Sequence, residues 1–288
     1  MGSTLVRVRR TVVYLAWTLA LMPVQAAGLV LRQPWVAQLP RLYHRRCCRI
    51  LGLRVRQIGE AAAAQPVLFA SNHVSYADIT VLGSLIPGSF VAKSEVAGWP
   101  LFGWLAKLQR SVFVDRQVRS TAQQRDAIAE RLAAGDALIL FPEGTSGDGN
   151  FVLPFKSALF SVVFDTKEPV TVQPVSLAYT RLDGLPIGRS LRPLFAYYGD
   201  MILAPHIWRL IGLGTIEVTV EFHPPVALAD FPSRKALADY CHQRVSSGVS
   251  RLLAGRGEPS PRPVVPAPER APVAAELPAA ELPAAAAG

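Results

Sequence analysis

Cysteine is scarce in this sequence of 288 residues, which contains Cys47, Cys48 and Cys241 and no others. Two of the three are adjacent, so they cannot build a disulfide framework, and they are too few for a four-cysteine zinc site. We therefore expect no disulfide-stabilised secreted domain, and we expect the main domain to face the cytoplasm. Lipidation of the adjacent pair is an alternative to burial of the two thiols, which is the commoner fate of free cysteine.

Motifs that would assign the chain to several other classes are also missing. The sequence has no zinc-ligand, homeodomain-like or aromatic-basic signature, so we do not expect nucleic acid as a partner. It has no Gly-x-Ser-x-Gly nucleophile elbow, which argues against a serine hydrolase. It has no internal repeat, so the main body is expected to form one domain.

Basic residues are abundant, with 30 Lys and Arg against 21 Asp and Glu and a formal net charge of +9. Half of the residues are hydrophobic and the mean hydropathy is +0.26, which is high for a soluble enzyme and low for a polytopic transporter. Many arginines flank apolar sequence near the N-terminus, namely Arg7, Arg9, Arg10, Arg32, Arg41, Arg45, Arg46 and Arg49. This arrangement predicts binding to an anionic membrane surface.

The uncharged stretch between Arg10 and Arg32 is close to the roughly 20 residues that cross a hydrocarbon core. Pro23 predicts a bend, so this segment either spans the membrane or enters one leaflet and returns. A cleavable signal peptide is the alternative, because a basic start precedes the stretch and VQAAG resembles a cleavage region. The long apolar part and the basic cluster after it argue against cleavage.

Three parts of the chain differ in composition. Residues 1–53 are predicted to form membrane-anchoring and interfacial helices, since Trp35, Tyr43 and several arginines suit the headgroup layer. Residues 54–255 alternate short apolar runs with helix-like stretches, which is typical of an α/β domain with a mostly parallel or mixed sheet flanked by helices. Residues 256–288 are dominated by Pro, Ala and Glu and are predicted to be a disordered tail.

The α/β domain is expected to contain six strands. They lie near 67–71, 89–94, 111–115, 137–141, 170–179 and 216–222. Pro174 predicts that the fifth strand is an edge strand, bulged or broken, because proline cannot donate to a sheet. The segment STAQQRDAIAERLAAG predicts a helix that is capped by Ser120 or Thr121 and ended by Gly135. Another helix is expected within 229–255.

The clearest chemical signal is the sequence SNHVSYAD at residues 71–78, directly after the first predicted strand. If Ser75 caps a helix that begins at Tyr76, Asp78 occupies the third helical position and can orient His73. Such a pair fixes one imidazole tautomer and stabilises the imidazolium that forms when His73 takes a proton. An acceptor hydroxyl can then stand where a protein serine otherwise would, and attack a thioester. A capping pair beside a loop histidine is the alternative.

A second signal is FPEGTSGDG, into which the fourth predicted strand runs. Active residues of open α/β sheets lie at the carboxyl ends of strands, so Glu143 and His73 occupy equivalent positions. The glycines and hydroxyls allow backbone N–H groups to approach an oxyanion or phosphate, and Glu143 could hold a substrate hydroxyl. Taken alone, this segment could be an ordinary turn.

Four segments resemble, in order, the four motif blocks of the glycerophosphate and lysophosphatidate acyltransferase family. They are NHVSYAD, FVDR at 113–116, FPEGTS at 141–146 and QPV at 173–175. The resemblance covers about residues 65–180 and includes Lys93-Ser94-Glu95. It implies a monotopic enzyme of the inner (cytoplasmic) membrane that moves a fatty acyl group from acyl carrier protein or coenzyme A onto the hydroxyl of a lysolipid.

The resemblance also implies roles for individual residues. His73 and Asp78 would be the catalytic pair. Acceptor binding would fall to Arg116, Glu143, Gly144 and Thr145, with Lys93 contributing to anion binding. No metal and no tightly bound cofactor is implied. The apolar segment 201–214 is expected to be either a second interfacial segment or part of the acyl-chain pocket.

One position departs from the family pattern, because the usual third block ends in Gly-Thr-Arg and Ser146 follows Thr145 here. Serine cannot replace the charge of a phosphate-binding guanidinium. Either Lys93, Arg116 and Lys156 hold the phosphate, or the acceptor has a different headgroup.

GTSGDGNFVLPFKSALF also resembles the lyso-ornithine lipid acyltransferase branch of the family, in which Asp148 could pair with the ornithine ammonium; a turn is the alternative for Asp148. The expected product is phosphatidic acid from 1-acyl-sn-glycerol 3-phosphate, and ornithine lipid is the alternative. An inactive membrane adaptor is a hypothesis of another class, against which the intact His73 and Asp78 argue.

Overall fold

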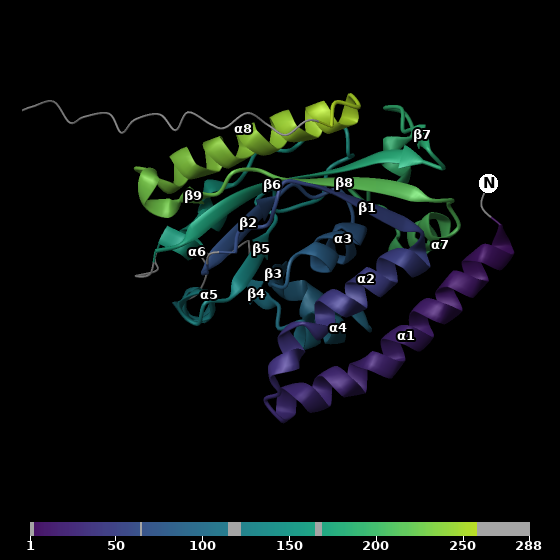
Figure 1. The fold of residues 1–288 in the computed structure, drawn as a ribbon, viewed down its shortest axis with the longest axis horizontal. Coiled ribbons are helices and arrows are strands. Elements are labelled where there is room, and N and C mark those ends of the chain that lie inside the picture. Colours follow the sequence, from purple (N-terminus) through teal and green to yellow (C-terminus); the bar gives the residue numbers. More distant parts are fainter. Residues whose placement is uncertain (1–2, 64, 115–121, 165–168, 258–288) are drawn as a thin grey trace, which may run out of the picture.

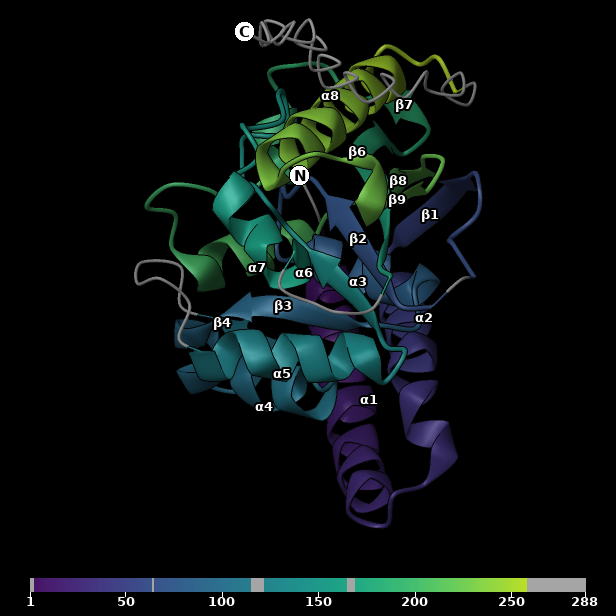
Figure 2. The same cartoon turned by 90° about the vertical axis from the view of Figure 1, so that its left-hand side faces the viewer.

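The computed structural model describes residues 3–63, 65–114, 122–164 and 169–257. They form one mixed sheet with helices on both faces (Figure 1). Helix α8 (Arg234–Leu253) covers one face, and α2 (Leu39–Leu51) and α3 (Ala77–Leu85) cover the other. Turning the molecule shows the N-terminal helices extending away from the sheet on the side opposite α8 (Figure 2). The predicted fold class is confirmed.

The described residues form a nine-stranded sheet with the order β1-β8-β6-β2-β5-β3-β4, and β7 and β9 pair with β6. Neighbours along the main order are parallel, except that β6 and β8 are antiparallel. The strands are β1 (Leu53–Ile58), β2 (Val67–Ser71), β3 (Ser89–Lys93), β4 (Val112–Val114), β5 (Ala137–Leu140), β6 (Thr171–Leu182), β7 (Leu185–Pro186), β8 (Ile216–Phe222) and β9 (Val226–Ala227).

The six predicted strands are all present, with ends that differ by at most a few residues. The prediction that Pro174 marks an edge strand is wrong, because β6 lies between β2 and β8. The carbonyl of Pro174 accepts the N–H of His223, and in an extended strand the nitrogen and carbonyl of one residue point to the same side. The missing N–H therefore falls just beyond the last β6–β8 pair, Val175 with Phe222, where it costs one terminal hydrogen bond.

The N-terminal helices form a hairpin. Helix α1 (Thr4–Val30) continues through Pro23, a short 3-10 helix (Pro34–Ala37) follows, and α2 returns along α1 (Figure 1). In the described part of the chain, α1 is the helix that is long and apolar enough to cross a membrane. The hairpin is fixed to the main domain where Arg10 donates to the carbonyls of Ile211 and Leu213.

Helix α2 presents two different faces. His44, Cys47, Cys48 and Leu51 are buried, whereas Arg45, Arg46 and Arg49 are exposed. The burial of both thiols agrees with the expectation that they are structural. Close packing against α3 requires Gly83, because a Cβ atom there would lie 2.4 Å from the His44 ring.

The remaining helices are α4 (Phe102–Leu108), α5 (Ala122–Ala133), α6 (Ser161–Phe164) and α7 (Leu203–Ile211). Helix α5 ends before Gly135, whose φ of 78° is the left-handed conformation expected at a helix end. The proposed caps, Ser120 and Thr121, lie outside the described residues. So do positions 258–288 of the predicted disordered tail. The C-terminal helix expected within 229–255 is confirmed as α8.

Candidate active site

Asn72 places the histidine loop at the end of β2. The ladder between β2 and β6 ends at Ser71 and Val175, but the Asn72 side chain continues it. Its Nδ2 donates to the Leu177 carbonyl over 2.9 Å, and its Oδ1 accepts the Leu177 N–H over 2.8 Å. Sequence reasoning missed this role, for which the only signal was an amide residue next to the histidine.

The structure brings His73 and Asp78 together. Nδ1 of His73 lies 2.9 Å from Oδ2 of Asp78, and the same oxygen accepts the N–H groups of Val74 at 2.6 Å and Ser75 at 2.9 Å. Helix α3 begins at Ala77 with Tyr76 as its N-cap, so the prediction that Ser75 caps the helix is wrong, although the Ser75 hydroxyl accepts the N–H of Ala77 over 3.4 Å. Asp78 occupies the second helical position instead of the third. Asp78 is completely buried, whereas the His73 side chain is 19% exposed.

The imidazole of His73 stacks on the ring of Phe141, with centroids 4.1 Å apart and planes 18° from parallel. Because Nδ1 faces Asp78, the second nitrogen is the one that a substrate could reach. Within the described residues Nε2 has no hydrogen-bond partner, and His73 lines a large cavity. This arrangement suits a base that accepts a proton at Nε2.

Glu143 links the second motif to the first. Its Oε1 accepts the backbone N–H of His73 over 2.6 Å, and its Oε2 accepts the N–H of Leu153 over 2.7 Å. The N–H of Gly147 donates to the His73 carbonyl over 2.9 Å, so the loop holds both sides of the His73 backbone. Burial raises the pKa of Glu143 to about 8, although the two N–H donors act in the opposite direction.

The expected acceptor-binding residues are divided between the cavity and other places. Gly144 and Thr145 line the cavity, as does Lys93, whose ammonium forms an ion pair with Glu95. Glu143 is buried behind them, and Arg116 lies outside the described residues. Gly144 has a φ of 73°, and a Cβ atom there would lie 2.9 Å from Nζ of Lys156, so this lysine folds across the motif.

Ser146 occupies the position at which the resemblance leads one to expect arginine. Its hydroxyl donates to the carbonyl of Tyr197, and the N–H of Tyr197 donates to the carbonyl of Val74 over 2.9 Å. The rings of Tyr197 and Tyr76 meet edge to face, and the Tyr76 hydroxyl contacts Nδ1 of His206 at 3.0 Å. Sequence reasoning missed these aromatic residues, since only the tertiary structure brings them together.

Asp148 does not line the cavity. Its carboxylate accepts the backbone and side-chain N–H groups of Asn150 at 2.9 and 3.0 Å, and Arg192 donates to the Asn150 side chain. These contacts match the turn that was the alternative interpretation of this residue.

The cavity beside His73 has a volume of about 600 Å³ and lies between the helical hairpin and the main domain. Most of its wall is apolar, and it includes Leu21, Met22, Leu39, Ile79, Phe102, Leu105, Ala106, Leu203, Ile207 and Leu210. The last three belong to α7, so part of segment 201–214 lines this cavity, and its role in binding an acyl chain stays a prediction. A mostly apolar cavity with a histidine in its wall suits a fatty chain whose reactive group lies beside that histidine.

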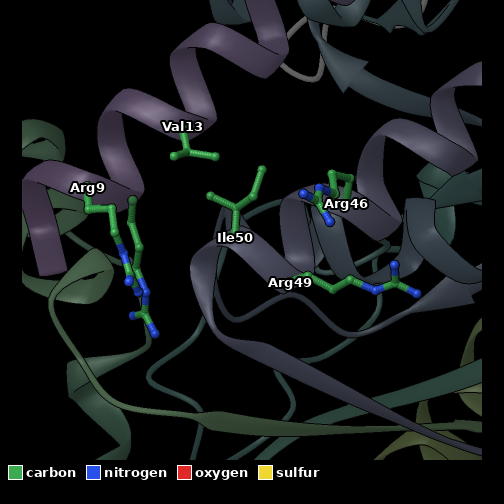
Figure 3. A pocket seen from close by; sticks show the side chains of 6 residues that line it. Arg9, Val13, Arg46, Arg49 and Ile50 are labelled. Carbon is green, nitrogen blue, oxygen red and sulfur yellow. The ribbon is translucent and has the colours of Figure 1, made fainter.

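A smaller basic hollow of about 220 Å³ lies where the two helices of the hairpin diverge (Figure 3). Arg9, Arg46 and Arg49 border it and are exposed. Val13 and Ile50 complete its apolar wall, and Arg10 also lines it. The hollow is thus a cationic surface next to the exposed apolar side chains of α1.

The fold and the site together define an acyltransferase: a histidine is paired with a buried carboxylate and opens onto an apolar cavity, and among the described residues no hydroxyl or thiol side chain is hydrogen-bonded to its ring. The sequence model of a family described as Acyltransferase matches residues 52–178. The chain belongs to this acyltransferase family, and the resemblance stated from the four motifs is confirmed.

Several relatives carry more specific names. The chain is 44% identical over 250 residues to a lyso-ornithine lipid O-acyltransferase of Brucella abortus (strain 2308), covering 85% of this chain and 94% of that one. It is 43% identical over 256 residues to the protein of that name from Rhizobium meliloti (strain 1021), covering 85% and 88%. It is 32% identical over 197 residues to a 1-acyl-sn-glycerol-3-phosphate acyltransferase of Neisseria gonorrhoeae, covering 67% and 74%.

The fold also matches a solved structure. The crystal structure of the 1-acyl-sn-glycerophosphate (LPA) acyltransferase PlsC from Thermotoga maritima superimposes with a TM-score of 0.60. The two sequences are 23% identical, and the match covers 88% of this chain and all of that one. This likeness bears on the fold.

Proposed function

We propose that the protein transfers a fatty acyl group from a thioester to the hydroxyl of lyso-ornithine lipid. The observation that carries the choice of acceptor is Ser146, a neutral residue whose hydroxyl is engaged by the Tyr197 carbonyl. A phosphate placed there would lack the guanidinium that normally neutralises it, and an unpaired anion in an apolar cavity is costly. The relatives named for lyso-ornithine lipid support this choice.

In the proposed mechanism, Nε2 of His73 takes the proton of the acceptor hydroxyl as its oxygen attacks the thioester carbonyl. Asp78 holds the Nδ1–H and stabilises the imidazolium that forms. When the tetrahedral intermediate collapses, the carbon–sulfur bond breaks and Nε2 returns the proton to the thiolate. The products are an ester and a free thiol, and no covalent enzyme intermediate is needed.

A second acceptor, 1-acyl-sn-glycerol 3-phosphate, is favoured by one observation. Lys156 folds across Gly144, and Lys93 lines the cavity that Gly144 also lines. Together they could neutralise a phosphate in place of the missing arginine. Phosphatidic acid would then be the product.

We also propose that the hairpin anchors the enzyme to the cytoplasmic face of the inner membrane. Large apolar side chains are exposed along it, among them Leu5, Val12, Leu19, Val30 and Leu31. The basic hollow is lined by the first half of α1 and the last half of α2, away from the connection between them, so it would meet anionic headgroups while the connection enters the bilayer. The donor would be acyl carrier protein or coenzyme A carrying the acyl chain.

Purified protein tests this function when it is given labelled acyl-acyl carrier protein or acyl-coenzyme A together with each of the two acceptors. We expect product from lyso-ornithine lipid, and a loss of about 100-fold or more in His73→Ala. His242→Ala is the matched control, because this histidine lies on α8 against the Val152 carbonyl. Transfer only to 1-acyl-sn-glycerol 3-phosphate would show that this lipid, and not lyso-ornithine lipid, is the acceptor. Activity that survives in His73→Ala would overturn the mechanism.

A further inference from the structure

We propose that Tyr179 is a positioning residue for this reaction, which fixes the carboxylate of Asp78 so that the carboxylate in turn fixes His73. The proposal rests on the proposed function, since it takes His73 as the base. It adds a third residue, from a different part of the chain, to the pair expected from the sequence.

The two oxygens of Asp78 are held by different groups. Oη of Tyr179 donates to Oδ1 over 2.7 Å, while Oδ2 accepts Nδ1 of His73 and two backbone N–H groups. Among the described residues, Tyr179 is the hydrogen-bond donor that contacts Oδ1. Asp78 is completely buried and Tyr179 is 4% exposed, so water cannot readily replace the tyrosine.

The sheet explains why Tyr179 reaches this carboxylate. Strand β6 continues to Leu182, well past the point where β2 ends, and the Asn72 side chain extends the pairing as far as Leu177. Tyr179 follows two residues later on the same face of β6. Its ring stacks on Phe195, with centroids 5.7 Å apart and planes 15° from parallel, so the hydroxyl is held in one place.

A buried tyrosine is a suitable partner for this carboxylate. Burial and the neighbouring Asp78 raise the pKa of Tyr179 well above its ordinary value, so that it stays a neutral donor. A neutral donor orients Asp78 without adding a positive charge that would compete with the imidazolium of His73. Asp78 therefore keeps its attraction for the Nδ1–H, which leaves Nε2 free to accept a proton.

Without the tyrosine hydroxyl, Oδ1 becomes a buried anionic oxygen with no donor, and we expect the carboxylate to rotate to find one. His73 then populates its other neutral tautomer, in which Nε2 carries the proton. That tautomer cannot take a proton from the acceptor, so the fraction of competent enzyme falls.

The test is Tyr179→Phe, which removes the hydroxyl and keeps the ring that stacks on Phe195. We expect kcat to fall about tenfold, equivalent to roughly 1.4 kcal/mol, with the KM of both substrates unchanged because Tyr179 does not line the cavity. ¹⁵N NMR of histidine-labelled protein in micelles reads the tautomer directly. His73 is identified among the five histidines by the loss of its signals in His73→Gln.

In the wild-type protein we expect His73 to be protonated at Nδ1 and bare at Nε2, and in Tyr179→Phe we expect a mixture of the two tautomers. Ser176→Ala is the matched control, because it removes a buried hydroxyl from the opposite face of the same strand. Ser176 contacts His223 and the Val245 carbonyl. This control should lose thermal stability and keep both kcat and the His73 tautomer.

A fall in stability of Tyr179→Phe with kcat and tautomer unchanged would overturn the proposal, as would a rise in KM alone. If Tyr179→Phe does not fold, the ¹⁵N spectrum of the wild-type protein tests the proposal. A mixture of His73 tautomers in that spectrum would contradict an Asp78 carboxylate fixed by Tyr179. Activity that persists in His73→Ala would instead refute the proposed function. The tautomer measurement does not depend on turnover, so the two failures are distinguishable.

Discussion

The carboxyl group of Glu143 accepts the backbone N–H of His73 over 2.6 Å, and this contact joins the two chemical motifs of the chain. Its other oxygen accepts the N–H of Leu153. Sequence reasoning expected Glu143 to contact the acceptor, and that role stays a prediction. In the structure, the buried Glu143 side chain fixes the main chain at His73.

We expect Glu143→Gln to lower kcat and thermal stability while leaving the KM of the acceptor unchanged. Each oxygen of the Glu143 carboxyl group can accept an N–H even when the group is protonated, whereas glutamine offers a single accepting oxygen to the same two N–H groups. The N–H left without a partner is a buried donor, which costs about 1–3 kcal/mol. Steady-state kinetics and thermal unfolding of the purified variant check this. Glu130→Gln on the exposed side of α5 is the control. A higher KM with normal kcat and Tm would show instead that Glu143 binds the acceptor.

Glu143 should also give stability a characteristic pH dependence. Its pKa is about 8 in the folded protein against an ordinary value of 4.5, so between these values the folded state keeps a proton that the unfolded state has released. Stability therefore falls as the pH rises from about 4.5 to about 8. Burial lowers the pKa of His223 to about 4, which has the opposite effect below about pH 6.5.

The informative window is therefore pH 6.5 to 8. There we expect the Tm of the wild-type protein to decrease with pH more steeply than that of Glu143→Gln, in which this position does not titrate. Parallel curves for the two proteins would contradict the assignment of the raised pKa to Glu143.

We expect Ser146→Arg to shift the acceptor preference toward 1-acyl-sn-glycerol 3-phosphate. The new guanidinium can form a bidentate pair with a phosphate, through two parallel N–H···O hydrogen bonds. The hydrogen bond from Ser146 to the Tyr197 carbonyl is lost. The measurement is the ratio of kcat/KM for the two acceptors. Ser146→Ala controls for the lost hydroxyl, and equal ratios in the two variants would show that this position does not select the headgroup.

The double variant Arg46→Gln and Arg49→Gln should bind anionic vesicles more weakly, by about 1 kcal/mol for each arginine, with a smaller salt dependence. Both residues border the basic hollow (Figure 3). Flotation with vesicles of phosphatidylglycerol and phosphatidylcholine measures the change. The control, Arg234→Gln with Lys235→Gln, removes the same charge from the exposed start of α8, on the other face of the sheet. Equal losses would mean that net charge alone attracts the protein to the membrane.

Much of the fold was predictable because its strands are short apolar runs between polar turns. Strand β1 was missed, because its arginines and glutamine resemble the basic segment before it, and only parallel pairing with β8 makes it a strand. Pro174 misled the prediction for a related reason. The low strand propensity of proline is a property of the residue alone. The cost of its missing N–H depends on whether a partner strand lies on that side of the strand at that position.

For the site, the sequence determined the residues that are close along the chain. His73 and Asp78 are five positions apart, and the turn that leads into α3 is enough to bring them together. The likeness of the third motif to a turn that can approach an anion was also visible, as was the apolar N-terminal segment.

The tertiary structure alone decided the contacts between distant segments. Tyr179 reaches Asp78 because β6 extends beyond the end of β2, and Glu143 holds His73 because β2 and β5 are neighbours. Ser146 donates directly to the carbonyl of Tyr197, which lies far along the chain. The sequence by itself determined which chemistry the chain carries, since local geometry follows from local sequence. How that chemistry is oriented depends on strand order and register, which many weak long-range contacts determine together.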